Sequence, residues 1–409
     1  MTSSQVKNFG VMSSFFGTHT LSPLHDRFFD PLYEAYEKAE RGRSCTSLPD
    51  TDLLEIGIRR CLSGERTGRG FLAQLEDCCD RRVAPSLFFE SLKSQRRCRL
   101  IGEVSQSICD TIDRTCATGH DPFATVASLS PYDIYAGDGH YVEHASHDVR
   151  IDEKVFATGD MFGLNLRSHS MFLLTHALRG GTRKREHDMH ALKRLSVETL
   201  RQQAPCGRQV IWVWDRACID ANFWTKLKMQ HGVYFVSRAK DNMCLDSLGH
   251  LPYDASHPDN AGVTGFELVS VANQALRCVY YTCPVNGSEY TFLSTLTTVE
   301  PGIIAHLYRA RWDIEKAFEV TKRKLNESKS WGTTQTAKTI HAQMRALAFN
   351  LLLLLERRLE KEHDMTDASE QNRRKKRMND DLALSRKSPA LPTTPTSSIK
   401  RCCRRLQRT

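Results

Sequence analysis

Several features that mark other protein classes are missing from this sequence. A secretory signal is not apparent, because the opening residues MTSSQVKNFGVMSSFF have neither a basic segment nor a long apolar core. The longest apolar run, Ala346–Leu355, contains Asn350 and is too short to cross a bilayer. No motif for ATP or another nucleotide cofactor is present. These absences predict a cytoplasmic protein that uses no nucleotide cofactor.

Cysteine pairs with zinc-site spacing are also missing, although the chain has 14 cysteines. None of them forms a C-x2-C pair. The adjacent pairs Cys78–Cys79 and Cys402–Cys403 suit neither a simple disulfide nor a tetrahedral metal site. We therefore expect reduced thiols, as is usual for a cytosolic protein.

An excess of positive charge is absent from most of the chain, although the net charge is +9. Residues 373–409 hold twelve Lys and Arg against two Asp, whereas the first 372 residues carry 45 basic and 46 acidic side chains. A nucleic-acid surface on the globular part must therefore be a local stripe. Residues 364–409 are polar and then rich in Pro, Ser and Thr, which predicts a disordered basic tail that adds non-specific, salt-sensitive affinity.

The most informative stretch that is present is YRARWDIEKAFEVTK, residues 308–322. It contains a Y-x2-R-x3-E-x6-K pattern formed by Tyr308, Arg311, Glu315 and Lys322. On an α-helix these four positions fall within about 60° of arc and therefore share one face. The carboxylate can hold a hard metal ion, and the cations can contact phosphates. The alternative is a solvated polar face with an Arg311–Glu315 ion pair, and Glu319 lies on the same face.

At 409 residues the chain is long enough for two or three domains. Residues 1–125 show apolar side chains at intervals of three and four, which predicts a helical domain. Basic side chains gather there in two groups: Arg59, Arg60, Arg66 and Arg69, and Lys93, Arg96, Arg97 and Arg99. This region is either a DNA-binding domain whose cations meet phosphates or an ordinary helical domain with solvated charges.

From residue 130 the pattern changes to strands. The runs YDIYAGDGHYV, VFATGDMFGLNLRS and HSMFLLTHALR predict three strands, followed by a helix over 187–202. RQVIWVWDRA then predicts a buried strand, DANFWTKLKMQHG a helix that stops at Gly232, and VYFVSRAK a further strand. This order is that of an RNase H-like α/β core, a mixed sheet with flanking helices, over residues 130–360. Residues 241–290 predict a β-rich insertion before the helix that begins near Tyr308.

Two aspartates belong to the predicted strands. Asp138 lies inside the first strand, where a carboxylate needs a cation, a hydrogen-bonded partner or an open sheet end. Asp215 ends VIWVWD, where an adjacent strand would deliver a second acid. Each has a structural alternative, Asp138 as a turn or bulge residue and Asp215 as a helix N-cap. The nearest competing acids are Asp133, Asp148 and Asp220.

Taken together, these motifs resemble the bacterial insertion-sequence transposases of the IS-four type, which carry an Asp-Asp-Glu (DDE) triad on an RNase H-like fold. The resemblance rests on "D-G" at Asp138, "D-R-x-x-x-D" from Asp215 and the Y-x2-R-x3-E-x6-K pattern, and it covers roughly residues 50–360. In that family the insertion supplies an aromatic, usually Trp, that stacks on a base. Here the insertion has no Trp, and the aromatics near it are Tyr253, Phe266, Tyr280, Tyr281, Tyr290 and Phe292.

The resemblance implies a role for each matching residue. Asp138, Asp215 and Glu315 would coordinate two Mg²⁺ ions, for which Mn²⁺ could substitute. DNA phosphates would be contacted by Tyr308, Arg311 and Lys322, with Arg216, Arg238 and Lys240 as further DNA-contact candidates. The implied activity is metal-dependent cleavage at terminal inverted repeats and strand transfer into target DNA, by a homodimer on DNA. The alternatives are an RNase H-like nuclease without strand transfer and a decayed copy that only binds DNA.

Overall fold

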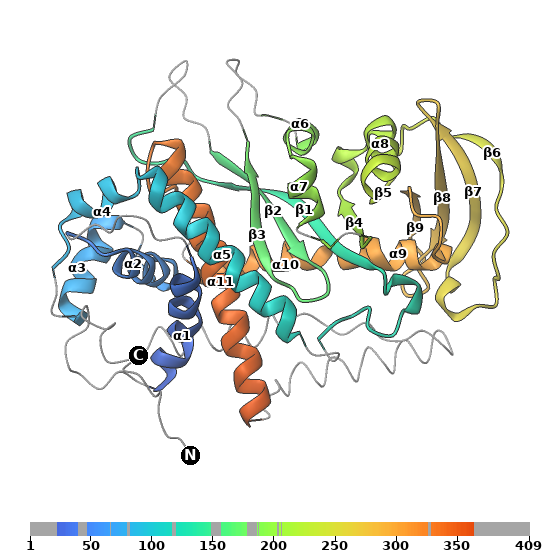
Figure 1. Cartoon of the computed structure of the whole chain (residues 1–409). Helices are drawn as coiled ribbons and strands as arrows, with labels where there is room; N and C mark the ends of the chain where they lie inside the picture. Colours follow the sequence, from blue (N-terminus) through green and yellow to red (C-terminus); the bar gives the residue numbers. More distant parts are fainter. Residues whose placement is uncertain are drawn as a thin grey trace.

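A sheet of nine strands runs through the protein, with helices on both of its faces (Figure 1). The computed structural model describes residues 23–39, 47–65, 67–79, 82–116, 120–148, 157–177, 186, 188–202, 204–205, 207–325 and 329–363. The strands are β1 (Tyr132–Val142), β2 (Thr158–Asn165), β3 (Met171–His176), β4 (Gln209–Trp214), β5 (Val233–Arg238), β6 (Asp246–His250), β7 (Val263–Val271), β8 (Gln274–Thr282) and β9 (Glu289–Ser294).

The helices fall into an N-terminal group, a group between the strands and a C-terminal group. The first contains α1 (Pro23–Lys38), α2 (Asp50–Leu62), α3 (Gly68–Cys79), α4 (Pro85–Ser91) and α5 (Gln95–Thr115). The second contains α6 (Asp188–Lys193), α7 (Val197–Arg201) and α8 (Ala221–His231). The third contains α9 (Pro301–Ala310), α10 (Trp312–Lys324) and α11 (Gln335–His363). Short 3₁₀ turns cover Ala127–Leu129 (η1), Arg216–Cys218 (η2) and Pro258–Asn260 (η3).

The strand order is β3-β2-β1-β4-β5-β9-β8-β7-β6. Strands β1, β4 and β5 are parallel to one another, and every other neighbouring pair is antiparallel. The protein is therefore a mixed α/β fold with N-terminal helices, consistent with an RNase H-like core. All strands and helices expected in residues 130–240 are present, with one change: the helix expected over 187–202 is two helices. Ser196 caps α7 by accepting a hydrogen bond from the Thr199 amide, which restarts the helix.

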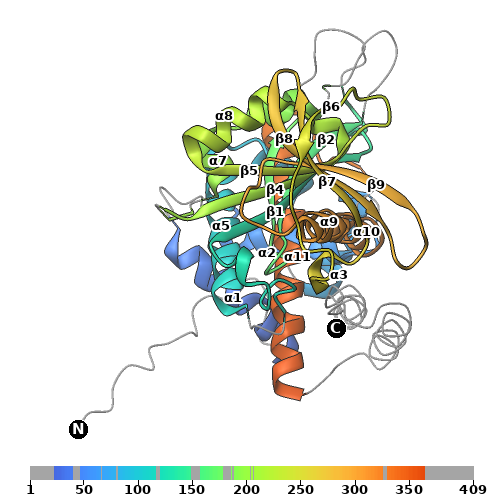
Figure 2. The ribbon, with the colours of Figure 1, turned by 90° about the vertical axis from the view of Figure 1, so that its right-hand side faces the viewer.

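Two hydrophobic cores form because alternate residues of a strand point to opposite faces of the sheet. Ile134 and Ala136 of β1 join the core that contains α9, α10 and α11. Tyr135, between them, joins the core that contains residues of α6, α7 and α8. Figure 2 shows α7 and α8 on one side of the sheet and α9 and α10 on the other. Asp138 has the same parity as Ala136, so its side chain belongs to the α9–α10 side.

The stretch 308–322 differs from the single helix expected there. Helix α9 ends at Ala310 and α10 begins at Trp312, with Arg311 between them. Arg311 keeps helical angles (φ −52°, ψ −31°). The bonds at the junction span three residues, from the Arg311 amide to the Tyr308 carbonyl and from the Ile314 amide to the Arg311 carbonyl. The junction is thus a tighter, 3₁₀-like turn, from which the Arg311 side chain reaches Asp138 of the sheet.

The insertion is confirmed as β structure and extends the same sheet. Three of its expected runs are β7, β8 and β9, and β9 pairs with β5 through Val236 and Ser294. Strand β6 forms the outer edge of the sheet and was not predicted as a separate strand. Figure 1 shows β6–β9 at the end of the molecule opposite α1–α4. Strand β5 therefore separates the insertion from β4 and β1, the strands associated with two of the candidate acids.

The N-terminal region is helical as expected, and its helices pack on α11. Residues of α1, α2 and α5 share one core with α11. Several of its cations make internal contacts: Arg96 and Arg97 both bond Asp50, and Arg60 lies over the Trp331 ring at 4.5 Å. A DNA-binding role for this region stays a prediction. None of the described helices is long and apolar enough to span a membrane, and the basic tail (364–409) lies outside the described residues.

Candidate active site

Asp138 sits in the middle of β1 with its carboxylate partly open to solvent. Asp138 lies opposite Phe162 in the regular register of β1 and β2, so it is not part of a β-bulge. Oδ1 accepts a hydrogen bond from the Gly139 amide at 2.8 Å, and Oδ2 accepts one from Arg311 at 3.2 Å. Burial raises the pKa of Asp138 to about 6, against the lowering effects of the Arg311 guanidinium and the Gly139 hydrogen bond. This carboxyl therefore already has a cation and a donor as partners.

The register of two parallel strands places Asp215 next to Asp138. Gly137 of β1 pairs with Trp214 of β4, so the following residues on the two strands are Asp138 and Asp215. Asp215 occupies the N-cap position of η2, yet its side chain makes no capping hydrogen bond in the described structure. Instead, Oδ1 accepts a hydrogen bond of 3.4 Å from the Tyr308 hydroxyl. Asp215 therefore faces α9 instead of serving as a cap.

Glu315 reaches the same place from the first turn of α10. Its Oε1 accepts a hydrogen bond of 2.7 Å from Nη2 of Arg311, whose Nη1 bonds Asp138. The guanidinium thus bridges the first and third candidate acids. Glu319, the competing acid on α10, pairs instead with Arg323 at 2.8 Å, and both are largely exposed. The geometry therefore favours Glu315 over Glu319, although both lie on one helix.

Tyr308 connects the acids to the insertion. Its hydroxyl bonds Asp215, and its ring centroid lies 5.1 Å from that of Phe292 on β9. Phe292 in turn stacks with Tyr290, with centroids 5.9 Å apart. Burial raises the pKa of Tyr308, so its hydroxyl stays a proton donor near neutral pH. A row of three aromatic rings therefore runs from the acids into the inserted sheet.

The other predicted DNA-contact residues have different partners in the described part of the chain. Arg216 and Arg238 lie 3.5 Å and 3.7 Å from the carboxylate of Asp241. Lys322 is exposed on α10, and its charge helps to lower the pKa of buried His140. Lys240 is close enough to favour the thiolate of Cys218 electrostatically. The structure thus places these four cations on elements next to the acids, while Tyr308 and Arg311 contact the acids directly.

The competing acids named from the sequence are held elsewhere. Asp133 pairs with Arg208 at 2.6 Å, and buried Asp148 pairs with Lys338 at 2.8 Å. Asp220 caps α8 by accepting from the Phe223 amide. Each of these three carboxylates therefore has a structural partner of its own.

Three residues near the site were missed by sequence reasoning. Asp188 begins α6, and its Oδ1 lies 3.0 Å from where a Cβ on Gly139 would be. Its charge contributes to the raised pKa of Asp138. Trp312 begins α10 and is 54% exposed, which is unusual for so large an apolar side chain. The third residue is Asp241, whose carboxylate pairs with Arg216 and Arg238, two of the candidate DNA contacts. No spacing in the sequence singles out Asp188 or Asp241, whereas Trp312 stands inside the motif.

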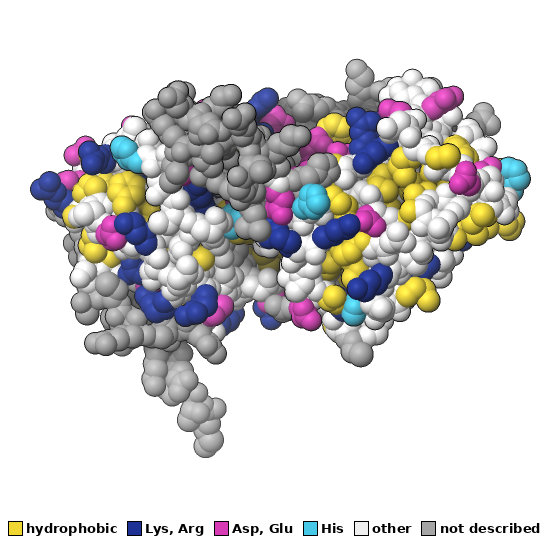
Figure 3. All heavy atoms as spheres, turned by 90° about the horizontal axis from the view of Figure 1, so that it is seen from above, with side chains coloured by type: hydrophobic (Ala, Val, Ile, Leu, Met, Phe, Trp, Pro, Cys, Tyr) yellow, Lys and Arg dark blue, Asp and Glu magenta, His cyan; other side chains and the backbone are white. Residues whose placement is uncertain are grey.

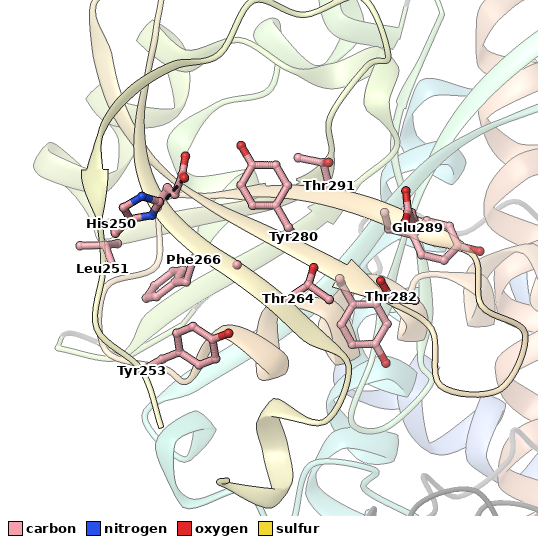
Figure 4. A pocket seen from close by; sticks show the side chains of 13 residues that line it. His250, Leu251, Tyr253, Thr264, Phe266, Tyr280, Thr282, Glu289 and Thr291 are labelled. Atoms are coloured by element: carbon pink, nitrogen blue, oxygen red, sulfur yellow. Dashed lines mark ion pairs between the residues drawn. The ribbon is translucent and has the colours of Figure 1, made fainter. Parts of the chain in front are cut away.

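A pocket of about 570 Å³ lies on the inserted sheet (Figure 4). Its lining includes five of the six predicted stacking aromatics: Tyr253, Phe266, Tyr280, Tyr281 and Tyr290. Thr264, Thr282 and Thr291 add hydroxyl groups, and His250 pairs with Glu267 at its rim. The sixth aromatic, Phe292, lies in the core between Tyr290 and Tyr308. The insertion thus groups aromatic and hydroxyl side chains although it lacks Trp.

The surface shows how the charges are distributed. On the face seen from above, Lys and Arg alternate with Asp, Glu and apolar side chains (Figure 3). This mixture agrees with the balanced charge of the first 372 residues. A DNA contact on this part of the molecule must therefore rely on local groups.

The three acids are suitable donors for a hard divalent cation. They come from β1, the end of β4 and α10, and two of them already share one positive group, Arg311. Carboxylate oxygens are the ligands that Mg²⁺ prefers. Among the described residues, no three His, Cys, Asp or Glu side chains are already gathered to hold an ion. The donor set therefore fits by chemistry, with the guanidinium of Arg311 between two of its members.

Comparison with known protein families indicates the class of protein to which this site belongs. Residues 165–351 match the family model of the transposase DDE domain. No curated protein matches the chain. Asp215 and Glu315 fall inside the matched range, and Asp138 precedes it. The chain therefore carries a DDE transposase domain over these residues, which suggests activity in DNA transposition. Such enzymes act on DNA and generally use divalent metal ions.

Proposed function

We propose that this protein is a cut-and-paste DNA transposase of the IS-four type, which binds the terminal inverted repeats of its own element. The observation that carries the proposal is that one helix junction contacts all three acids: Arg311 bonds Asp138 and Glu315, and Tyr308 bonds Asp215. Asp138, Asp215 and Glu315 would hold two Mg²⁺ ions, with Mn²⁺ able to substitute. When bound, the ions would activate the attacking oxygen and stabilise the leaving 3′ oxygen.

The remaining side chains would bind and orient the DNA end. The Tyr308 hydroxyl holds Asp215 in place, and Arg311 and Lys322 supply positive charge for phosphates close to the cut. Arg216, Arg238 and Lys240 would extend this contact along the adjacent backbone. The ring of exposed Trp312 and the aromatic pocket of the insertion offer stacking surfaces for unpaired bases.

Transposition also requires two DNA ends to be brought together. We infer a homodimer on DNA, in which each subunit cuts one element end and joins it to target DNA. The helices α1–α5 would help to grip the repeat through exposed cations such as Arg69. The basic tail would add affinity that does not depend on base sequence.

The test is a cleavage assay on DNA from the ends that flank the gene, with Mg²⁺ or with EDTA. Asp138→Asn removes one proposed ligand, and Asp133→Asn, on the same strand but paired with Arg208, is the matched control. We expect metal-dependent cuts at one defined position, lost in Asp138→Asn and kept in Asp133→Asn. Scattered cuts would favour a general nuclease, and specific binding without cuts would favour a decayed copy.

A further inference from the structure

Arg311 occupies the position between two carboxylates that a bound cation would take. Its Nη1 bonds Asp138 Oδ2 at 3.2 Å, and its Nη2 bonds Glu315 Oε1 at 2.7 Å. The side chain of Arg311 is only 6% exposed, whereas those of Asp138 and Glu315 are 22% and 33% exposed. The guanidinium thus lies beneath the two acids and holds them together from inside.

The hydrogen-bonding capacity of Arg311 is not used up by these contacts. Its Nε is buried and has no hydrogen-bond partner within the described part of the chain. Its guanidinium carbon lies 5.6 Å from the Tyr308 ring centroid and 5.8 Å from that of exposed Trp312. A buried donor without an acceptor is unfavourable, so this side chain has something to gain from an additional acceptor.

We propose that Arg311 couples the binding of a divalent metal to the binding of DNA. In the free protein its guanidinium takes the place of the metal beside the two carboxylates. We call this coupling the interlock. This inference rests on the proposed function, because it takes Asp138 and Glu315 as metal ligands. A divalent ion at these carboxylates meets a like charge already bonded to both, so free protein binds metal weakly. Metal binding requires the guanidinium to move away from at least one acid.

A DNA phosphate is the group that would draw the guanidinium away. Arginine forms two parallel hydrogen bonds with a phosphate, which would replace the bonds to Asp138 and Glu315 and could satisfy Nε. The position of Arg311 at the tight turn between α9 and α10 lets it move without unfolding either helix. The carboxylates are then released for metal, so cleavage is confined to protein that already holds DNA.

Coupling of this kind is reciprocal. If DNA raises the affinity for metal by a given factor, metal raises the affinity for DNA by the same factor. Couplings between linked sites are typically about 5- to 150-fold. The interlock therefore predicts a change in metal affinity that can be measured without any cleavage.

The experiment is titration of the full chain with Mn²⁺, followed by the electron paramagnetic resonance signal of the free ion. It is made without DNA and with a duplex carrying the element end, after subtraction of Mn²⁺ bound by the duplex alone. The variants are Arg311→Gln, Arg311→Lys and Arg309→Gln. Arg309 is an exposed neighbour on α9 and serves as the control for loss of one positive charge.

For the wild type and Arg309→Gln we expect DNA to tighten Mn²⁺ binding by about 5- to 150-fold. Arg311→Gln should bind Mn²⁺ without DNA more tightly than the wild type, by a similar factor, and should lose most of the DNA effect. Arg311→Lys should fall between them. If Arg311→Gln does not fold, the wild-type DNA effect and the lysine variant still decide the question.

Two outcomes would overturn the interlock. One is wild-type Mn²⁺ affinity that DNA does not change, and the other is an Arg311→Gln variant that binds Mn²⁺ as the wild type does or more weakly. Asp138→Asn separates this failure from failure of the proposed function. If Asp138→Asn binds Mn²⁺ like the wild type, the metal site itself is wrong. If it loses Mn²⁺ while Arg311→Gln is unchanged, the site stands and the interlock alone is rejected.

Discussion

Gly137 of β1 lies directly against the indole of Trp214 on β4. A Cβ placed on Gly137 would come within 2.2 Å of the Trp214 ring. The two residues are also register partners, and the next residues along their strands are Asp138 and Asp215. The close fit of this glycine and tryptophan on one face of the sheet thus sets the register that brings Asp138 and Asp215 together on the opposite face.

Gly137→Ala should therefore destabilise the protein by about 1–3 kcal/mol, because overpacking a filled core forces neighbours to shift. Trp214 has little freedom to move, since it is buried and stacks on Trp212 with centroids 5.3 Å apart. Urea unfolding measures the change. Gly64→Ala is the control, because nothing lies within 4 Å of a Cβ there. Equal stability of the two variants would show that the contact is not tight.

Glu315→Gln should abolish cleavage while leaving binding to element ends largely intact. Loss of a metal ligand should lower the cleavage rate by more than about 100-fold, beyond the effect of losing a ligand's outer partner. Gel-shift and cleavage assays on the same DNA separate the two effects. Glu319→Gln is the matched control, since Glu319 pairs with Arg323 on the same helix. Retained cleavage in Glu315→Gln would transfer the role to another acid, with Glu319 first.

His341 should make the protein less stable in mild acid. It is buried on α11 with its ring stacked on Trp331, and burial lowers its pKa to about 3, helped by nearby Arg60 and opposed by Asp160. A histidine with a lowered folded pKa binds fewer protons than in the unfolded chain. Stability is therefore unaffected above about pH 6.5 and falls as the pH drops toward about 3.

This single group should cost about 2 kcal/mol between about pH 7.5 and about pH 5. His140 is also buried with a pKa lowered to about 3, so it adds a parallel loss. The free energy of unfolding of the wild type and of His341→Gln, measured at both pH values, gives the contribution of His341. An identical pH slope in the two proteins would contradict the assignment.

Deletion of residues 373–409 should weaken binding to DNA of any sequence. The segment holds twelve Lys and Arg, and each phosphate contact contributes about 0.9 to the slope of log affinity against log salt concentration. Fluorescence anisotropy with mixed-sequence duplexes over a salt series measures this slope. A truncated protein with the same slope as the full chain would show that these cations do not meet phosphates.

Much of the fold could be predicted from local patterns. The alternation of YDIYAGDGHYV matches β1 residue for residue, and Asp220 and Gly232 bound α8 as its N-cap and C-cap. Errors occurred where a single polar residue restarted a helix, as Ser196 does for α7. The break at Arg311 could not be predicted from the sequence, because the residues around it favour a continuous helix.

The order of the motifs along the chain was enough to propose the three acids. Local periodicity predicts the strands associated with two of them and the helical setting of the third, whereas their identification as a triad comes from the resemblance to the IS-four type. The DDE domain match independently supports the class of enzyme. What the sequence leaves open is the choice between neighbours of the same chemistry, such as Glu315 and Glu319, because both satisfy the same helical spacing.

Tertiary structure adds contacts between residues far apart in the chain, which distinguish such neighbours by their partners. Arg311 meets Asp138 across 173 positions, and Tyr308 meets Asp215 across 93. It also showed that Arg311, predicted either as a phosphate contact or as the ion-pair partner of Glu315, bridges Glu315 and Asp138. Sequence periodicity determines which residues share a strand or a helix face, since it reflects local backbone geometry. Which of those faces meet, and which charge stands between two carboxylates, depends on the packing of α9 and α10 against the sheet.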